Sequence, residues 1–240
     1  YYSVLMQWLA WQVQYKGKKL LWAPVIQSIE GVGKSWFQKL LGEMIGMNNV
    51  KIVSPGEVTN NFNGWAVGSC VNILNEIYIT GHNRYEAVNA IKPLITDSAI
   101  MINDKGVKQY QAINVTNYIC FTNYKNAIPM GADSRRWWVI FVEIDDLEKM
   151  GSELGMSKVG YFDAIFDALT FHGDEVLKFF MEYEITDEFK ALKQAPDTIY
   201  KDAVVATEKS LAIDGLEEAE ELLNNPKSNK YNTEFVSTYH

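Results

Sequence analysis

L-L-W-A-P-V-I (residues 20–26), Q-S-I-E-G-V-G-K-S (27–35) and W-F-Q-K-L-L-G-E-M-I-G (36–46) form the stretch around which this chain is organised. The first piece is an apolar run of strand length, and the last has apolar residues at helical spacing. A glycine loop between a strand and a helix is typical of a phosphate site, because backbone N–H groups and the helix N-terminus face the anion. We expect Lys34 to reach the β- and γ-phosphates of ATP, and the Ser35 hydroxyl to bind Mg²⁺.

The full phosphate-loop pattern has glycine at position 28, where this chain has Ser28. A small residue still permits a tight turn. The alternative interpretation is an ordinary strand-to-helix turn with a surface lysine. The flanking strand and helix, each of suitable length, favour the phosphate loop.

Composition excludes several classes of protein. The chain has 240 residues, of which 48% are hydrophobic and 13% aromatic, which is typical of a globular protein. No apolar run approaches the roughly 18 residues that a membrane span needs. Cys70 and Cys120 lie in apolar runs and predict reduced, buried thiols in a cytoplasmic protein. His82, His172 and His240 are too scattered for a zinc site or a histidine-based triad. The start lacks Met and a signal peptide, so we expect a segment of a longer polypeptide.

Charge is unevenly distributed along the chain. Residues 1–140 contain 13 Lys and Arg against 8 Asp and Glu, whereas residues 141–240 contain 9 against 22. The net charges are therefore +5 and −13. A mildly basic first part and an acidic last part fit a protein whose positive charge is confined to one surface.

Hydrophobic periodicity predicts an α/β arrangement. Further strands are expected at 50–53, 70–74, 115–122 and 137–144. Helices are expected at 3–15 and at 84–95, where Pro93 would kink or end the second one, and a short helix or irregular segment is expected at 57–69. A hairpin is expected at 100–113 around Asp104-Lys105-Gly106. Beyond residue 145 helical spacing dominates, at 160–183, 187–194, 198–212 and 215–224. We therefore predict a nucleotide-binding core at 1–146 and an acidic helical region at 147–240.

Two strands are followed at once by polar residues of catalytic type. Glu76 follows the strand at 70–74, about 40 residues after the phosphate loop, and we expect it to polarise the attacking water near the Mg²⁺ shell. Asn75 stands where ATPases usually have an acidic residue, and an amide holds the metal less strongly. Asn123 ends a neighbouring strand and would orient the water or the γ-phosphate; the alternative is a turn-forming asparagine.

Basic residues occur at two further positions. Arg135 and Arg136 precede the last strand, where one could serve as an arginine finger for a neighbouring subunit. The alternative is one exposed and one structural arginine. Lys105 and Lys108 lie at the hairpin tip with Tyr110 beyond, which suits phosphate contact and base stacking on single-stranded DNA; lysines there also serve solubility. The basic turn Lys16–Lys19 could contact nucleic acid, although a solvated loop is favoured.

Taken in order, these motifs resemble superfamily 3 helicases, in particular the helicase part of phage and plasmid primase-helicases and their poxvirus relatives. S-I-E-G-V-G-K-S resembles Walker A, and C-V-N-I-L-N-E resembles Walker B with Glu76 as its glutamate. L-I-T-D-S-A-I-M-I-N-D-K-G resembles the motif before sensor 1, Y-I-C-F-T-N the sensor-1 motif, and D-S-R-R-W-W the arginine-finger segment. F-K-A-L-K-Q-A-P-D-T is similar to the helical region that follows the core in the phage proteins.

The resemblance implies an AAA+ P-loop core with a central parallel sheet, an N-terminal helix and a C-terminal helical lobe. It implies an ATP-dependent DNA helicase or translocase that acts in replication as a homo-oligomeric ring, a hexamer, on single-stranded DNA, with an upstream primase or polymerase domain in the same polypeptide. ATP would be bound by Glu30, Gly31, Val32, Gly33, Lys34, Ser35 and Trp36, and Mg²⁺ by Ser35 and Glu76. Glu76, Asn123, Arg135 and Arg136 would be catalytic, and Lys105 and Lys108 would bind DNA.

Two other functions are open. Asn75 would suit a weakly hydrolysing ATP-binding module that oligomerises around DNA for an upstream polymerase. A small-molecule kinase with a P-loop would need a lid rich in arginines, and this chain offers only the Arg135-Arg136 pair.

Overall fold

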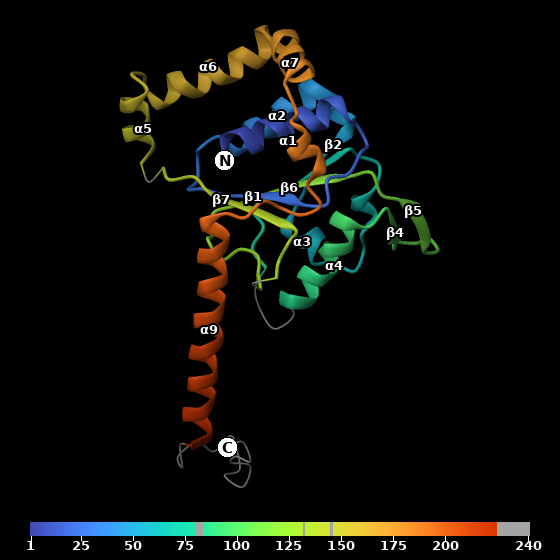
Figure 1. Ribbon diagram of the computed structural model, residues 1–240, viewed down its shortest axis with the longest axis vertical. Helices are drawn as coiled ribbons and strands as arrows, with labels where there is room; N and C mark the ends of the chain where they lie inside the picture. Colours follow the sequence, from blue (N-terminus) through green and yellow to red (C-terminus); the bar gives the residue numbers. More distant parts are fainter. Residues whose placement is uncertain (80–83, 132, 145, 225–240) are drawn as a thin grey trace.

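The computed structural model describes residues 1–79, 84–131, 133–144 and 146–224, and its centre is a five-stranded parallel sheet (Figure 1). The strands are β1 (Ala23–Gln27), β2 (Val50–Val53), β3 (Val71–Leu74), β6 (Asn117–Thr122) and β7 (Trp137–Phe141). Their order is β2-β3-β6-β1-β7, with every neighbouring pair parallel. The strands β2, β3 and β6 lie on one side of β1, and β7 lies on the other side, so the strand order reverses at β1. Ligands of open α/β sheets bind where the order reverses, outside the carboxyl ends of the strands.

All the predicted strands are present; β2 has the predicted bounds, and the others differ from the predicted bounds by a few residues. β1 begins at Ala23 rather than residue 20 because Leu21 and Trp22 form a bend, and β7 ends at Phe141 rather than residue 144. Both faces of the sheet are buried along β1, β3, β6 and most of β7, as expected for parallel strands, whereas the edge strand β2 is partly exposed. Side chains alternate between two cores: Ile119, Phe121, Trp138 and Ile140 face one, and Tyr118, Cys120, Trp137 and Val139 face the other.

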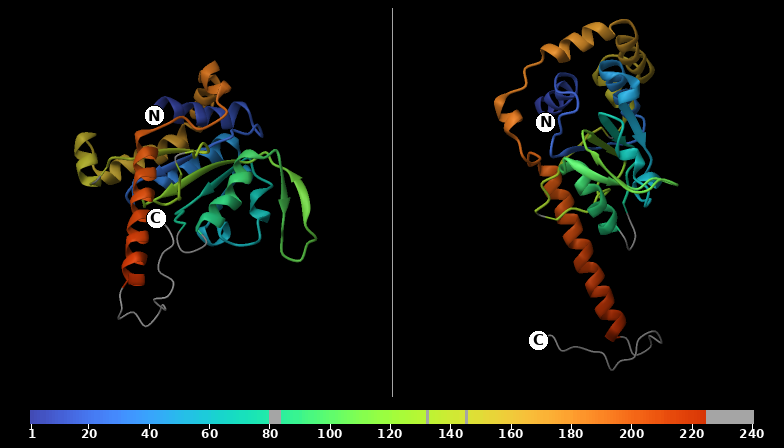
Figure 2. Two further views of the ribbon diagram at one scale, coloured as in Figure 1. Left: turned by 60° about the horizontal axis from the view of Figure 1, so that its bottom comes forward. Right: turned by 90° about the vertical axis from the view of Figure 1, so that its right-hand side faces the viewer.

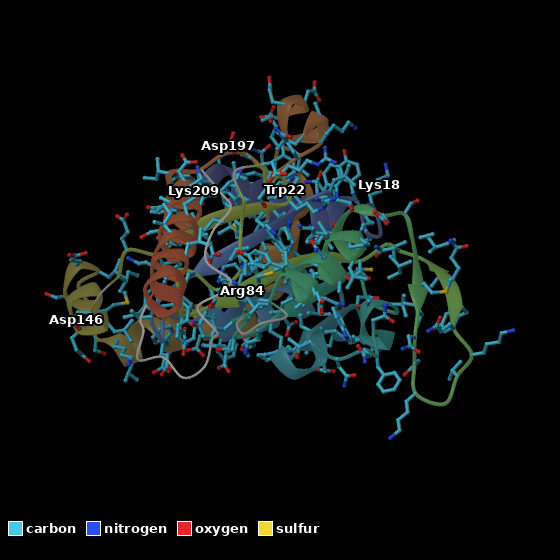
Figure 3. All side chains as sticks on the ribbon, turned by 90° about the horizontal axis from the view of Figure 1, so that it is seen from below. Lys18, Trp22, Arg84, Asp146, Asp197 and Lys209 are labelled. Carbon is cyan, nitrogen blue, oxygen red and sulfur yellow. The ribbon has the colours of Figure 1, made fainter. Side chains whose placement is uncertain are left out.

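Helices cover both faces and make a three-layered molecule (Figure 1). On one face lie α1 (Tyr2–Gln14), α2 (Lys34–Ile45) and α7 (Gly173–Glu182), and on the other lie α3 (Pro55–Val58), α4 (Arg84–Thr96) and the first turns of α9 (Ile199–Asn224). Pro93 lies inside α4. Four tryptophans, Trp8, Trp22, Trp137 and Trp138, are at most 1% exposed. Trp22 appears in the interior in Figure 3, and its ring meets that of Trp138 edge-on with centroids 6.0 Å apart.

The C-terminal helices differ from the predicted ones. The single helix expected at 160–183 consists of α6 (Lys158–Phe171) and α7, because His172 leaves the helical region with φ −129° and ψ 27°. The helices expected at 198–212 and 215–224 are one helix, α9, since a glycine such as Gly215 weakens a helix by only about 1 kcal/mol. α8 (Asp187–Ala191) ends before residue 194, and the short helix α5 (Leu147–Glu153) was not predicted.

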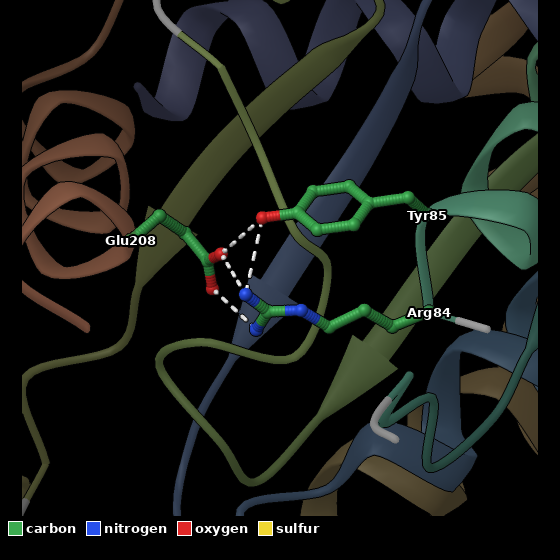
Figure 4. Close-up of polar contacts among 3 residues, drawn as sticks. All are labelled: Arg84, Tyr85 and Glu208. Atoms are coloured by element: carbon green, nitrogen blue, oxygen red, sulfur yellow. Dashed lines mark hydrogen bonds and ion pairs between the residues drawn. The ribbon is translucent and has the colours of Figure 1, made fainter. Parts of the chain in front are cut away.

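Buried polar contacts hold the start of α9 on the core. Thr198 Oγ1 donates a hydrogen bond of 2.7 Å to the Val139 carbonyl and accepts one from the Lys201 N–H. Further along, the carboxylate of Glu208 pairs with the Arg84 guanidinium of α4, with 3.1 Å between Nη2 and Oε2 (Figure 4). Figures 1 and 2 show the rest of α9 extending away from the sheet.

The predicted hairpin is present as β4 (Ala99–Ile102) and β5 (Tyr110–Ile113), which pair antiparallel. Its connection is longer than expected and runs over residues 103–109, with Gly106 in the left-handed region at φ 76°. The segment predicted as a short helix or irregular at 57–69 contains the end of α3 and the 3₁₀ turn η2 (Gly64–Ala66). Figure 2 shows the hairpin projecting from the side of the sheet.

Two smaller predictions are refined by the structure. Cys120 is buried, which raises the pKa of its thiol well above the ordinary value, whereas Cys70, just before β3, is only partly buried. In the basic turn, Lys18 lies at the surface (Figure 3), but Lys19 donates to the carbonyls of Leu94 (2.8 Å) and Thr116 (2.7 Å). Lys19 therefore has a structural role. Among the described residues, no helix is both long enough and apolar enough to cross a bilayer.

Candidate nucleotide site

The glycine loop lies between the end of β1 and the start of α2, at the carboxyl edge of the sheet. Gly31 and Gly33 have φ of 80° and 93°, in the left-handed region that glycine adopts without steric cost. Ser28 is fully buried, and its Oγ has no hydrogen-bond partner within the described part of the chain. The interior therefore accommodates a serine where the usual pattern has glycine.

A cavity of about 320 Å³ opens beside this loop. Its lining comes from the loop, α2 and the ends of β2, β3 and β6: Glu30, Gly31, Gly33, Lys34, Ser35, Gln38, Ile52, Ile73, Asn75, Glu76 and Asn123. Val32 and Trp36, predicted to contact the nucleotide, do not line it. The Trp36 indole instead donates to the Ile165 carbonyl of α6 at 2.9 Å.

Lys34 and Asn123 are brought together in this cavity. The Lys34 ammonium donates to Asn123 Oδ1, and Asn123 Nδ2 lies 3.4 Å from Glu30 Oε1. Burial lowers the pKa of Lys34, while the charges of Glu30 and Glu76 oppose that shift. An ammonium held among two carboxylates and an amide, and partly removed from water, is well placed to meet a polyphosphate.

Glu76 has a distorted backbone next to the cavity. Its φ of 53° is the only positive value among the described non-glycine residues. The strand neighbours hold it there, since Asn75 N–H donates to the Val53 carbonyl and Ile77 N–H to the Phe121 carbonyl. Non-glycine residues in this region concentrate at functional sites, because the surrounding structure must stabilise them.

The loops that carry Glu76 and Asn123 are linked by a contact that the sequence analysis missed. The rings of Tyr78 and Tyr124 stack with centroids 4.0 Å apart and planes 16° apart. Tyr78 follows Glu76 by two positions and Tyr124 follows Asn123 by one, and this spacing was the only sign in the sequence that the two rings could meet. The stack links the two loops close in sequence to the cavity residues Glu76 and Asn123.

The helices after β7 also reach the phosphate loop, which was not predicted. A Cβ built on Gly33 would lie 2.9 Å from the Phe162 ring, and one on Gly31 would lie 3.0 Å from Leu147 and 3.9 Å from the Lys158 ammonium. α6 is fixed there by Trp36 and by Lys39, whose ammonium donates to Thr170 Oγ1 at 2.8 Å. The sequence offered no signal for these contacts, because the partners are more than 100 residues apart.

Arg135 and Arg136 do not lie at this cavity. In the β1–β7 register Ala23 is opposite Trp137 and Gln27 is opposite Phe141, so both arginines precede the amino end of β7. Five residues of strand span roughly 16 Å, so the pair lies at the edge opposite its own phosphate loop. Arg135 is exposed, and Arg136 is partly buried with no hydrogen-bond partner for Nε among the described residues.

Lys105 and Lys108 also lie apart from the cavity, exposed on the connection of the hairpin. The described residues contain no cluster of three or more His, Cys, Asp or Glu that could hold a metal. Ser35, Asn75 and Glu76 nevertheless supply oxygen donors at one cavity. Mg²⁺ commonly takes one or two protein oxygens and completes its shell with substrate phosphates and water, so this donor set fits Mg²⁺ bound with a nucleotide.

The arrangement thus defines an α/β protein with a polar cavity at the carboxyl edge of a parallel sheet, and comparisons with known proteins bear on its relationships and its fold. Residues 26–136 match a family of unknown function, DUF5906. This segment runs from β1 to the residue before β7 and includes every predicted site residue. The chain is also related to the DNA primase-polymerase of Nitratiruptor phage NrS-1, with 25% identity over 140 residues.

Solved structures of the C-terminal region of NrS-1 in its apo form share the fold. One has a TM-score of 0.69 at 20% identity over 98% of this chain, and another has 0.66 at 19%. The present chain spans 19% of the phage primase-polymerase and 55% of those solved chains.

Proposed function

We propose that this chain is the ATP-hydrolysing core of a ring-forming DNA translocase that acts in DNA replication. The observation that carries the proposal is the meeting of Lys34, Ser35, Glu76 and Asn123 at one cavity. These residues come from three elements that are separate in the sequence. A surface lysine in an ordinary turn would not be expected to face a carboxylate and an amide from two neighbouring strands.

In this proposal each residue has one role. The N–H groups of the glycine loop and Lys34 bind the polyphosphate, and Glu76 orients and deprotonates the attacking water. Asn123 holds Lys34 and presents its amide to the terminal phosphate. Mg²⁺, bound by Ser35 and Glu76 with the nucleotide, would neutralise phosphate charge. The place of β6 between β1 and β3 supports an AAA+ type of core, because it sets Asn123 between the phosphate loop and Glu76.

The position of Arg135 and Arg136 supports a ring. Because they lie at the amino end of β7, opposite the carboxyl edge of the sheet, they do not reach the cavity of their own chain. In a ring, one of them would enter the cavity of a neighbouring copy. An arginine supplied in this way raises hydrolysis roughly 10³–10⁵-fold. A homo-oligomer, a hexamer by the resemblance, would then place the exposed hairpin lysines, Lys105 and Lys108, toward single-stranded DNA.

The replication role is supported by the relationship to the phage primase-polymerase. Because this chain covers only a fifth of that protein, an upstream primase or polymerase domain is part of the proposal.

Steady-state ATPase measurements with and without single-stranded DNA test this function. We expect turnover that DNA stimulates, and a Glu76→Gln variant that binds ATP but does not hydrolyse it. Lys105→Ala should keep basal turnover and lose both the stimulation and unwinding. Light scattering with ATP and an oligonucleotide should report a ring. A protein that stays monomeric under these conditions, with no ATPase activity, would refute the proposal.

Asn75 favours a second candidate, an ATP-binding module that oligomerises around DNA and hydrolyses ATP feebly. It lines the cavity where a second carboxylate would strengthen the metal site. An Asn75→Asp variant separates the two: a large gain in turnover would favour the weak module, whereas unchanged rapid turnover would favour the motor.

A further inference from the structure

The hairpin that carries Lys105 and Lys108 is fastened to the loop after β2 by a compact set of hydrogen bonds. Asn63 N–H donates to the Asn103 carbonyl at 3.0 Å, and Asn103 N–H donates to Asn63 Oδ1 at 2.7 Å. Asn63 Nδ2 donates to the Met101 carbonyl at 2.9 Å. Asn103 Nδ2 donates to the Asn61 carbonyl at 3.0 Å. The side chain of Asn63 thus accepts from one hairpin residue and donates to another.

The contact is also sterically close. A Cβ on Gly64 would lie 2.7 Å from Asp104 Oδ2, so a larger residue at this position would have to displace the Asp104 side chain at the start of the hairpin connection. The other end of the hairpin is fixed independently, since Asn114 Nδ2 donates to the Leu94 (2.7 Å) and Asp97 (2.9 Å) carbonyls. Asn63 therefore fixes the β4 end of the hairpin, the end that leads directly to Lys105.

The loop that bears Asn63 continues from a wall of the nucleotide cavity. Ile52 of β2 lines that cavity, and it also lines a second cavity of about 540 Å³ beside Gly64 and Asp104. Between Ile52 and Asn63 the chain is held by the capping box of α3, in which Ser54 N–H donates to Glu57 Oε2 at 2.9 Å. The Trp65 indole donates to the Glu57 carbonyl at 3.1 Å. A continuous, hydrogen-bonded segment thus joins the nucleotide cavity to the end of β4, where the hairpin connection begins.

We infer that Asn63 is the positioning residue that joins the hairpin to this segment, so that nucleotide in the cavity changes the affinity of the hairpin lysines for single-stranded DNA. Asn63 itself touches neither ligand. The inference rests on the proposed function, because it needs both ATP and DNA to bind. It adds the route by which the two sites are coupled and the residue at which that coupling can be broken.

The experiment measures the dissociation constant of a fluorescent single-stranded oligonucleotide with and without a non-hydrolysable ATP analogue. In the unmodified protein we expect the analogue to change this constant by ~5-fold or more, the range of ordinary allosteric coupling. In Asn63→Ala we expect the same constant with and without the analogue, with unaltered affinity for the analogue itself. Asn63→Asp keeps the acceptor for Asn103 N–H but loses the donor to Met101, and should show partial coupling.

Asn89→Ala is the matched control. Asn89 lies exposed on α4, where its Oδ1 accepts from Lys92 at 2.8 Å, and its loss should leave the coupling intact. Full coupling in Asn63→Ala would overturn the inference, as would absence of coupling in the unmodified protein when both ligands bind. Failure of the unmodified protein to bind either ligand would instead refute the proposed function, so the two failures are distinguishable.

Discussion

Removing the carboxylate of Glu208 should destabilise the protein more than any surface change. Glu208 is 6% exposed and Arg84 26% exposed, and their side chains make two contacts, 3.1 Å and 3.4 Å long (Figure 4). Losing one partner of a buried pair leaves the other charge unpaired and costs about 3–5 kcal/mol. We expect about 3 kcal/mol for Glu208→Ala, at the low end, because water reaches part of the guanidinium. That is a large fraction of the 5–15 kcal/mol typical of whole proteins.

Urea denaturation measures this directly. Glu208→Ala should lower the midpoint with an unchanged m-value, and the double variant with Arg84→Ala should be less destabilised than the sum of the two single variants. Glu182→Ala is the matched control, because its pair with Lys178 is exposed and 4.0 Å long. It should change the free energy of unfolding by under ~1 kcal/mol. A loss below ~1 kcal/mol for Glu208→Ala, or simple additivity, would show that this pair does not anchor α9.

Three other predictions concern separate regions. Burial lowers the pKa of Lys19 from 10.5 to about 7, so between these values the unfolded chain binds a proton that the folded chain lacks. The free energy of unfolding should therefore rise with pH in this range, by up to ~1.4 kcal/mol per pH unit relative to that of Lys19→Gln. Denaturation of both proteins at pH 7 and 9 measures this difference in free energy. The same difference at both pH values would contradict the prediction. Gly33→Ala places a Cβ at φ 93° against Phe162, and should lower stability by about 1–2 kcal/mol and abolish ATP binding, whereas Gly173→Ala, with open space, should do neither. Arg136→Ala should retain ATP binding by calorimetry and lose ~10³-fold in turnover; normal turnover would remove it as the finger.

The sequence was sufficient for the sheet and the phosphate loop because both depend on local patterns. An apolar run of strand length marks each strand. The glycines before Lys34 indicate a turn in the left-handed conformation, which Gly31 and Gly33 adopt. Glu76 and Asn123 could be anticipated because polar residues that end parallel strands meet at one edge. Their relative positions follow from the strand order, in which β6 lies between β1 and β3.

What could not be predicted depends on contacts between distant segments. Nothing near Phe162 indicates that it packs on Gly33, and nothing near Asn63 indicates that it holds Asn103. Periodicity also missed the helix break at His172 and predicted a break between residues 212 and 215 that is absent, since one non-helical residue separates α6 from α7 while α9 continues through Gly215. Function tied to such contacts becomes visible only in three dimensions.

Calorimetric titration of Mg²⁺-ATP tests the central claim, that the loop ending in Lys34 binds a triphosphate. Lys34→Ala should weaken binding at least ~10-fold, because a charge-assisted hydrogen bond contributes about 1.5–3 kcal/mol. Lys39→Ala, one turn further along α2 and bonded to Thr170 of α6, should bind ATP as the unmodified protein does. Equal affinity of Lys34→Ala and the unmodified protein would contradict the account.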